Sequence, residues 1–214
     1  MPTILWDLDG PLVPSEPLRD KAHQETVKHF GGTISPGFYL EIDGTGRPHE
    51  DVRKEFIRES GIETDEQHYS DVFYKLLFAA LFPTPGIHSL INLLNAKGYR
   101  QAVVTGNYLE QAEKILAITN LRSGFERIVA KEHFRKPKPA PDSYQFALRS
   151  MGVEPENAIA IEDSTTGLTA AREAGLRVIA FRHNYNTDHD FTKAIAMVES
   201  FADPSIHEII NSAF

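Results

Sequence analysis

The chain has 214 residues, of which 41% are hydrophobic and 24% are charged, a composition typical of a folded globular protein. It contains no cysteine, which excludes disulfide bonds, thiolate metal sites and a cysteine nucleophile. The formal net charge of −8 disfavours a general nucleic-acid binder, because a DNA or RNA backbone is itself anionic. We therefore expect a small-molecule partner.

Neither a signal peptide nor a membrane segment is expected. A charge appears at Asp7 before any long apolar stretch can develop. No window approaches the roughly 18 consecutive apolar residues that a membrane helix needs. We expect a soluble, cytoplasmic protein, present as a monomer or homodimer.

Short apolar runs alternate with helix-like stretches along the chain. Each run ends in a small or acidic residue, as strands of a parallel sheet covered on both faces often do. The pattern predicts an α/β fold, a Rossmann-like doubly wound parallel sheet of at least five strands. The predicted strands are residues 3–8, 101–105, 127–130, 158–162 and 177–181.

The interval between the first two strands is too long for one crossover, which usually needs only loops and a helix. It has helical periodicity over residues 18–30, 47–60 and 65–81. We therefore predict an inserted helical domain at residues 15–82. Residues 1–14 and 83–214 form the α/β core domain, which ends in a helix near residues 204–214.

The first predicted strand ends in two acids, Asp7 and Asp9, followed by Gly10. Such residues lie where a parallel sheet presents its ligand site. An ordinary Asp-Gly turn explains the same residues equally well. The apolar neighbours Trp6 and Leu8 favour burial up to the acids, and buried carboxylates need a metal or another partner.

Two further segments bring groups suited to phosphate. Thr105 ends the second strand, and Gly106 and Asn107 form a turn that lets backbone amides approach an anion. A simple helix cap is the alternative. Lys138 lies in a proline-rich loop that can hold an ammonium group with little loss of entropy, although a solvent-facing loop would look similar.

The fourth predicted strand ends in Glu162 and Asp163. Both could simply be acids at a helix N-terminus. A further carboxylate beside Asp7 and Asp9 would be costly without a cation, however, and magnesium prefers oxygen ligands of this kind. The pattern predicts Mg²⁺ at this edge of the sheet.

These four elements resemble the four motifs of the haloacid-dehalogenase-like superfamily. The matching residues are Asp7-Leu8-Asp9-Gly10, Thr105, Lys138 and Glu162-Asp163. The resemblance covers nearly the whole chain, and the helical insert matches the cap domain that subclass I places after the first motif. Residues 15–17 and 138–142 resemble the phosphoglycolate-phosphatase and β-phosphoglucomutase-like branch.

The resemblance implies a magnesium-dependent phosphatase that hydrolyses a small phosphorylated metabolite through an aspartyl-phosphate. It implies that Asp7 attacks phosphorus and that Asp9 protonates the leaving oxygen and later activates water. Thr105 and Lys138 would hold the transferring phosphoryl group.

The resemblance also implies a set of metal ligands. Asp7, Asp163 and the backbone carbonyl of Asp9 would hold magnesium, with Glu162 as a further ligand or a nearby partner.

Substrate contacts are expected from Gly106 and Asn107 in the core, and from Arg19 and Arg47 in the cap. A solvated helix arginine is an equal alternative for each of the last two. Pro14 replaces the aspartate that this branch usually has at the cap entrance.

A sugar phosphomutase and a non-catalytic binding module on the same fold are the alternative functions. Arg19 aligns with the cap histidine that shuttles a proton in the mutases, and an arginine cannot do this at neutral pH. His23, one helical turn further on, keeps the mutase alternative open. Dehalogenation is disfavoured, because the resembling dehalogenases have no use for an acid at the position of Asp9.

Overall fold

The computed structural model describes residues 1–42 and 49–214 and divides into two compact units. The core unit comprises Met1–Pro14 and Phe82–Phe214, and the helical unit comprises Ser15–Leu81. Phe82, predicted to end the insert, therefore falls in the core unit. Arg47 lies outside the described residues.

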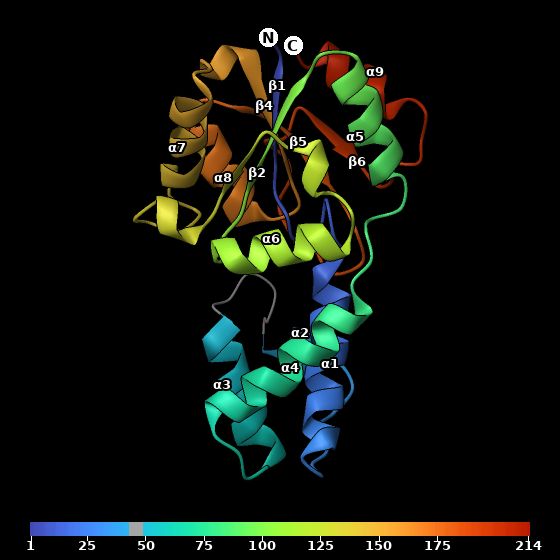
Figure 1. Cartoon of the computed structure of the whole chain (residues 1–214), viewed down its shortest axis with the longest axis vertical. Coiled ribbons are helices and arrows are strands. Elements are labelled where there is room, and N and C mark those ends of the chain that lie inside the picture. The colour runs from blue at the N-terminus through green and yellow to red at the C-terminus, as the bar shows by residue number, and fades with distance from the viewer. Residues whose placement is uncertain (43–48) are drawn as a thin grey trace. The chain divides into compact units, whose positions relative to one another are not determined.

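Six parallel strands form the sheet of the core unit, in the order β3-β2-β1-β4-β5-β6 (Figure 1). This confirms the predicted α/β class with at least five parallel strands. The strands are β1 (Thr3–Trp6), β2 (Arg100–Val104), β3 (Arg127–Val129), β4 (Ala158–Glu162), β5 (Arg177–Phe181) and β6 (Ala196–Val198). The sequence did not predict β6, because three residues are too few to show a strand pattern.

The helices of the core unit lie on both sides of this sheet. Figure 1 shows α7 and α8 together on one side, and α5 and α9 on the other. These elements and the short 3₁₀ turns between them are α5 (Ile87–Ala96), α6 (Leu109–Ile118), η1 (Arg122–Gly124), η2 (Lys131–His133), α7 (Asp142–Met151), η3 (Pro155–Asn157), α8 (Thr165–Glu173) and α9 (Ile206–Ser212).

Small residues on one face of the sheet let α7 and α8 pack closely. Ala102, Ala160 and Ala180 belong to a fully buried cluster that includes Tyr144 of α7 and Leu168 of α8. Side chains alternate between the faces of a strand, so the larger residues of the same strands point to the other face.

That other face is packed by aromatic side chains. Trp6 lies edge-on to Phe201, with 5.7 Å between ring centroids, and its indole N–H donates to Gln101 Oε1 over 3.0 Å. Burying residues on both faces makes the sheet the rigid part of the core unit.

The described part of the helical unit consists of four helices and contains no strand. They are α1 (Ser15–His29), α2 (Phe38–Glu41), α3 (His49–Ser60) and α4 (Glu66–Ala80). An inserted helical domain was therefore predicted correctly. Among the described residues, no helix is both long enough and apolar enough to cross a membrane.

Candidate active site

The strand register brings the predicted site residues to one level of the sheet. Trp6 of the central strand β1 pairs with Val103 of β2 and with Ile161 of β4. The next residue along, Asp7, donates its backbone N–H to the Ile161 carbonyl over 2.9 Å. Asp7 and Glu162 therefore lie at the same carboxyl edge of the parallel sheet, as Thr105 does after β2.

Lys138 connects the acids of two neighbouring strands. Its Nζ lies 2.5 Å from Asp7 Oδ1 and 2.6 Å from Glu162 Oε1, and it also donates to the Val104 carbonyl over 3.2 Å. Nζ also lies over the aromatic ring of Tyr144, 5.1 Å from the ring centroid. The loop lysine predicted from the sequence thus points into the sheet edge and not into solvent.

Burial and charge shift the pKa values of this pair in ways that keep Lys138 charged. Burial raises the pKa of Asp7 well above its usual range, and Lys138 offsets only part of this effect. Burial by itself lowers the pKa of Lys138, but the carboxylates of Asp7 and Glu162 outweigh it and raise that pKa above its ordinary value. Asp7 is therefore an acid that needs cationic neighbours to remain ionised.

Three buried acids form a group suited to a metal ion. Asp7, Glu162 and Asp163 each offer a carboxylate oxygen, and these atoms lie within 4.8 Å of one another. Gly10 makes room for this group, because a Cβ built there would collide with the Asp163 carboxylate. An all-oxygen, multiply charged set suits a hard divalent cation such as Mg²⁺.

Asn107 links Asp9 to Thr105. Its Nδ2 donates to Asp9 Oδ2 over 2.7 Å and to Thr105 Oγ1 over 3.1 Å, and its backbone N–H also donates to Thr105 Oγ1. Thr105 is fully buried and Asn107 is nearly so. The second acid of the first motif is thus held in place by the turn after β2, and Gly106 is the exposed residue of that turn.

Tyr144 is a site residue that the sequence did not predict. Its buried hydroxyl donates to Glu162 Oε1 over 2.6 Å, the same oxygen that contacts Lys138. Glu162 is completely buried, and Gly167 leaves room for it, since a Cβ there would collide with its carboxylate. Only the position of Tyr144 in the first turn of α7, close after Lys138, could have indicated this role.

His183 and Asn186 were also not predicted. His183 Nε2 lies 2.8 Å from Asp163 Oδ2, and Asn186 Nδ2 donates to the Asp163 backbone carbonyl over 2.8 Å. Both residues follow the end of β5. The strand-end argument that identified the four motifs would have pointed to this polar segment as well.

Two of the residues discussed for the helical unit, Arg19 and His23, are buried. Arg19 is only 2% exposed, and its Nη1 lies 3.2 Å from His49 Nδ1. His23 is stacked between Phe56 and Phe73, with centroids 4.4 and 4.2 Å away. Burial, with help from nearby cations that include Arg19, lowers the pKa of His23 well below its usual range, so it is a neutral packing residue.

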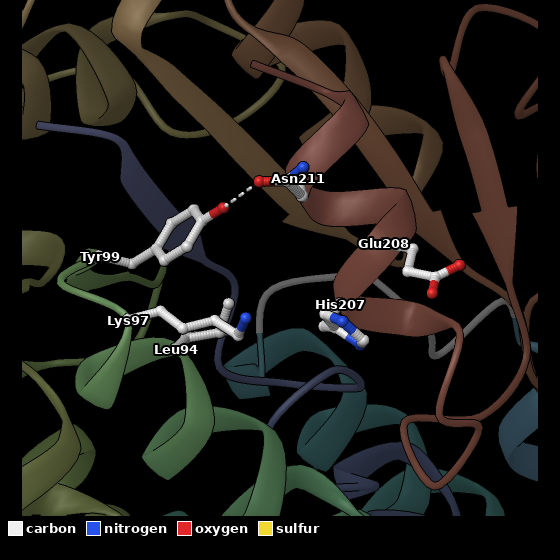
Figure 2. Close-up of a pocket in the computed structure, with 6 residues that line it drawn as sticks. All are labelled: Leu94, Lys97, Tyr99, His207, Glu208 and Asn211. Carbon is white, nitrogen blue, oxygen red and sulfur yellow. Dashed lines mark hydrogen bonds between the residues drawn. The ribbon is translucent and has the colours of Figure 1, made fainter.

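A pocket of about 200 Å³ lies elsewhere in the core unit. Figure 2 shows its lining residues, with Tyr99 donating to Asn211 Oδ1 over 3.2 Å. Tyr99 precedes β2, so this pocket is beside the amino end of a strand whose carboxyl end leads to Thr105. It contains none of the predicted site residues.

Comparison with known families matches residues 4–181 to the model described as haloacid dehalogenase-like hydrolase. The chain belongs to this family. The resemblance predicted from the four motifs is therefore confirmed.

Curated and structural relatives of this hydrolase family align with nearly the whole chain. Protein CbbY of Cereibacter sphaeroides is 32% identical over 94% of this chain and 92% of its own length. Phosphoglycolate phosphatase of Aquifex aeolicus is 32% identical over 83% of each chain. Crystal structures of CbbY from Rhodobacter sphaeroides, one with phosphate and one of a variant with xylulose-(1,5)bisphosphate, give a TM-score of 0.78 at 30% identity, covering 95% of this chain and 96% of theirs.

The contacts of Lys138 generate a test of site electrostatics. Lys138→Met leaves Asp7 and Glu162 buried without their ammonium partner, which should cost about 3–5 kcal/mol of unfolding free energy at neutral pH. The loss should shrink towards pH 5, because removing the ammonium raises the pKa of Asp7 further, so that in the variant this carboxyl takes up its proton at a higher pH than in the wild type. Urea denaturation at both pH values measures this.

Lys136→Met is the matched control, because Lys136 is exposed and lies in the same loop. It should change stability little at either pH. Equal effects of the two substitutions, or a Lys138→Met loss that grows as pH falls, would contradict the charge arrangement.

Proposed function

We propose that the protein is a magnesium-dependent phosphatase that hydrolyses a small-metabolite phosphomonoester through an aspartyl-phosphate on Asp7. The observation that carries this proposal is the buried Asp7 carboxylate, held by Lys138 beside Glu162 and Asp163 at the end of the central strand. Family membership and a relative named as a phosphatase support the reaction class.

Asp7 fits the role of nucleophile by its geometry. Lys138 holds Oδ1, which leaves Oδ2 as the oxygen to attack phosphorus. The attack forms an Oδ2–P bond and breaks the ester P–O bond, so one difficult displacement becomes two easier ones. The lysine charge then offsets negative charge on the phosphoryl oxygens during transfer.

Asp9 is suited to move the protons. In the first step it gives a proton to the departing ester oxygen, and in the second it takes one from the water that attacks the aspartyl-phosphate. Asn107 fixes the carboxylate through its 2.7 Å contact with Oδ2. The second step releases inorganic phosphate and restores the Asp7 carboxylate.

The Thr105 hydroxyl group is suited to donate a hydrogen bond to a phosphoryl oxygen. Its Oγ1 already accepts hydrogen bonds from the backbone and side-chain N–H groups of Asn107. The hydroxyl proton is therefore the part of the group that remains for a ligand. The backbone of Gly106 would bind beside it.

Mg²⁺ would be held by Asp7, Asp163 and the backbone carbonyl of Asp9, with Glu162 adjacent. When bound, it supplies positive charge that screens the acids from one another and polarises the phosphoryl group. The collision that a Cβ at Gly10 would have with Asp163 supports this close grouping of oxygens.

The helical unit is proposed to act as a cap that controls access to the site. Its two connections leave the core unit at one point, where Thr84 donates from its backbone to the Leu12 carbonyl and from its hydroxyl to the Gly10 carbonyl. Two chain segments joined there can serve as a hinge next to the first motif. We propose that Arg47 contributes to substrate choice, whereas Arg19 is only 2% exposed and, like His23, is held in the interior of the helical unit.

A phosphorylated sugar or sugar acid is the proposed substrate class, from the phosphoglycolate phosphatase relative and the bisphosphate bound by CbbY. The interior position of His23 weakens the mutase alternative. A cap histidine that shuttles protons must reach the substrate, whereas His23 is stacked in the interior of the helical unit and contacts Tyr69.

Phosphate release from a panel of sugar phosphates, phosphoglycolate and an aryl phosphate tests the function. We expect hydrolysis of at least one metabolite with magnesium and none after exhaustive chelation, with activity restored when magnesium is returned. Turnover that survives chelation would rule out the metal, and turnover that requires a sugar bisphosphate as activator would favour the mutase.

Substitution of the two first-motif acids separates their roles. Asp7→Asn removes the nucleophilic charge and should reduce turnover to background. Asp9→Asn should lower the turnover rate about 10²–10⁴-fold, because the amide cannot transfer the protons. The reduction should be smaller on an aryl phosphate, whose leaving group needs little protonation. Steady-state kinetics on an aryl and an alkyl phosphate measure both.

Asp71→Asn, on an exposed position of α4, is the control and should match the wild type. An Asp7→Asn variant with wild-type turnover would exclude Asp7 as the nucleophile. Equal losses of Asp9→Asn on both substrates would exclude Asp9 as the leaving-group acid.

A further inference from the structure

The segment that follows β5 folds back onto Asp163. His183 contacts its carboxylate, and its backbone carbonyl accepts from Asn186 Nδ2 over 2.8 Å and lies 3.3 Å from His189 Nδ1. None of these three residues belongs to the four motifs. A residue held at both its side chain and its backbone has little freedom to reorient.

The hydrogen bonds around His183 determine which ring nitrogen carries the proton. The backbone N–H of Tyr185 donates to His183 Nδ1 over 3.2 Å, so Nδ1 is an acceptor. In a neutral imidazole the proton then lies on Nε2, which donates to Asp163 Oδ2. Oδ2 of the Asp163 carboxylate thus accepts a hydrogen bond from the His183 ring.

Asn186 fixes the position from which His183 acts. It is completely buried, and its Nδ2 also donates to the Phe181 carbonyl over 2.9 Å. Its Oδ1 accepts the backbone N–H of His183 over 2.8 Å. Asn186 therefore connects the ends of β4 and β5 and the histidine through a single side chain.

The Asp163 carboxylate also packs closely against Gly10. The Gly10 φ of +93° is in the left-handed region, and a Cβ added there would overlap Oδ2 and Cγ of Asp163. Oδ2 therefore has both the Gly10 backbone and the His183 ring as close neighbours. Rotation of the carboxylate would break the histidine contact or meet the glycine.

We propose that His183 is a positioning residue for magnesium: its Nε2–H holds Asp163 in the orientation that binds the ion. The inference rests on the proposed function for the identity of that ion. Mg²⁺ requires near-octahedral geometry and tolerates misdirected ligands poorly. Groups that orient a metal ligand commonly contribute about 10–100-fold to affinity.

Two amide substitutions test this with the folded full-length chain. In His183→Gln the amide Nε2 occupies roughly the place of the imidazole Nε2 and can still donate to Asp163. In His183→Asn the side chain retains an acceptor for the Tyr185 N–H but is too short to reach the carboxylate. Calorimetric titration with MgCl₂, without substrate, measures the dissociation constant of each.

We expect His183→Asn to raise the magnesium dissociation constant about 10–100-fold and His183→Gln to stay close to the wild type. In phosphate-release assays, His183→Asn should need correspondingly more magnesium for half-maximal rate, and excess magnesium should restore kcat. A purely structural role would not be rescued in this way. His207→Asn, on α9, is the control and should leave magnesium affinity unchanged.

The outcomes separate this inference from the proposed function. Wild-type magnesium affinity in His183→Asn, or an equal loss in His183→Gln and His183→Asn, would overturn the positioning role alone. A wild-type protein that binds no magnesium would overturn the metal site and this inference together. The calorimetric result stands whether or not the correct phosphomonoester has been found.

Discussion

The candidate site depends on the close approach of carboxylates at the carboxyl edge of a buried sheet. Asp7, Glu162 and Asp163 place oxygens within 4.8 Å of one another in a region with little solvent. Carboxylates at this distance repel strongly, and burial increases the repulsion. Lys138 contacts two of the three, and a divalent cation would complete the neutralisation. Such a local electrostatic cost is typical of functional sites.

The surrounding fold is built to permit that approach. Gly10 and Gly167 leave space for Asp163 and Glu162, where any Cβ would intrude. Hydrogen bonds then orient the acids one by one, from Asn107 to Asp9, from Tyr144 to Glu162 and from His183 to Asp163. Each donor comes from a segment that follows a strand end or from the first turn of the next helix. The sheet thus supplies the position and the connecting segments supply the orientation.

Sequence patterns predicted the parts of this structure that depend on local periodicity. Five of the six strands, the helical insert and the gathering of the four motifs at one edge follow from apolar runs and the geometry of parallel sheets. The first strand was predicted to continue to Leu8, but β1 ends at Trp6 because the chain turns at Gly10, where the Gly10 N–H donates to the Val13 carbonyl.

Residues that act through long-range contacts were not predicted. Tyr144 lies 18 positions from its partner Glu162, and His183 lies 20 positions from Asp163. No periodicity links such positions, since the contact depends on how neighbouring strands pair. His23 shows the opposite case, because a histidine aligned near a catalytic position turned out to be part of an aromatic core.

The proposed mechanism requires that Asp7 becomes covalently phosphorylated during turnover. The most direct measurement is rapid acid quench of the protein during hydrolysis, followed by mass spectrometry of its peptides. A phosphate on Asp7 is predicted, with more of it in Asp9→Asn, because this variant lacks the base for the second step. Phosphate found on a different residue, or turnover without any phosphoenzyme in either protein, would contradict the account and favour direct attack by water.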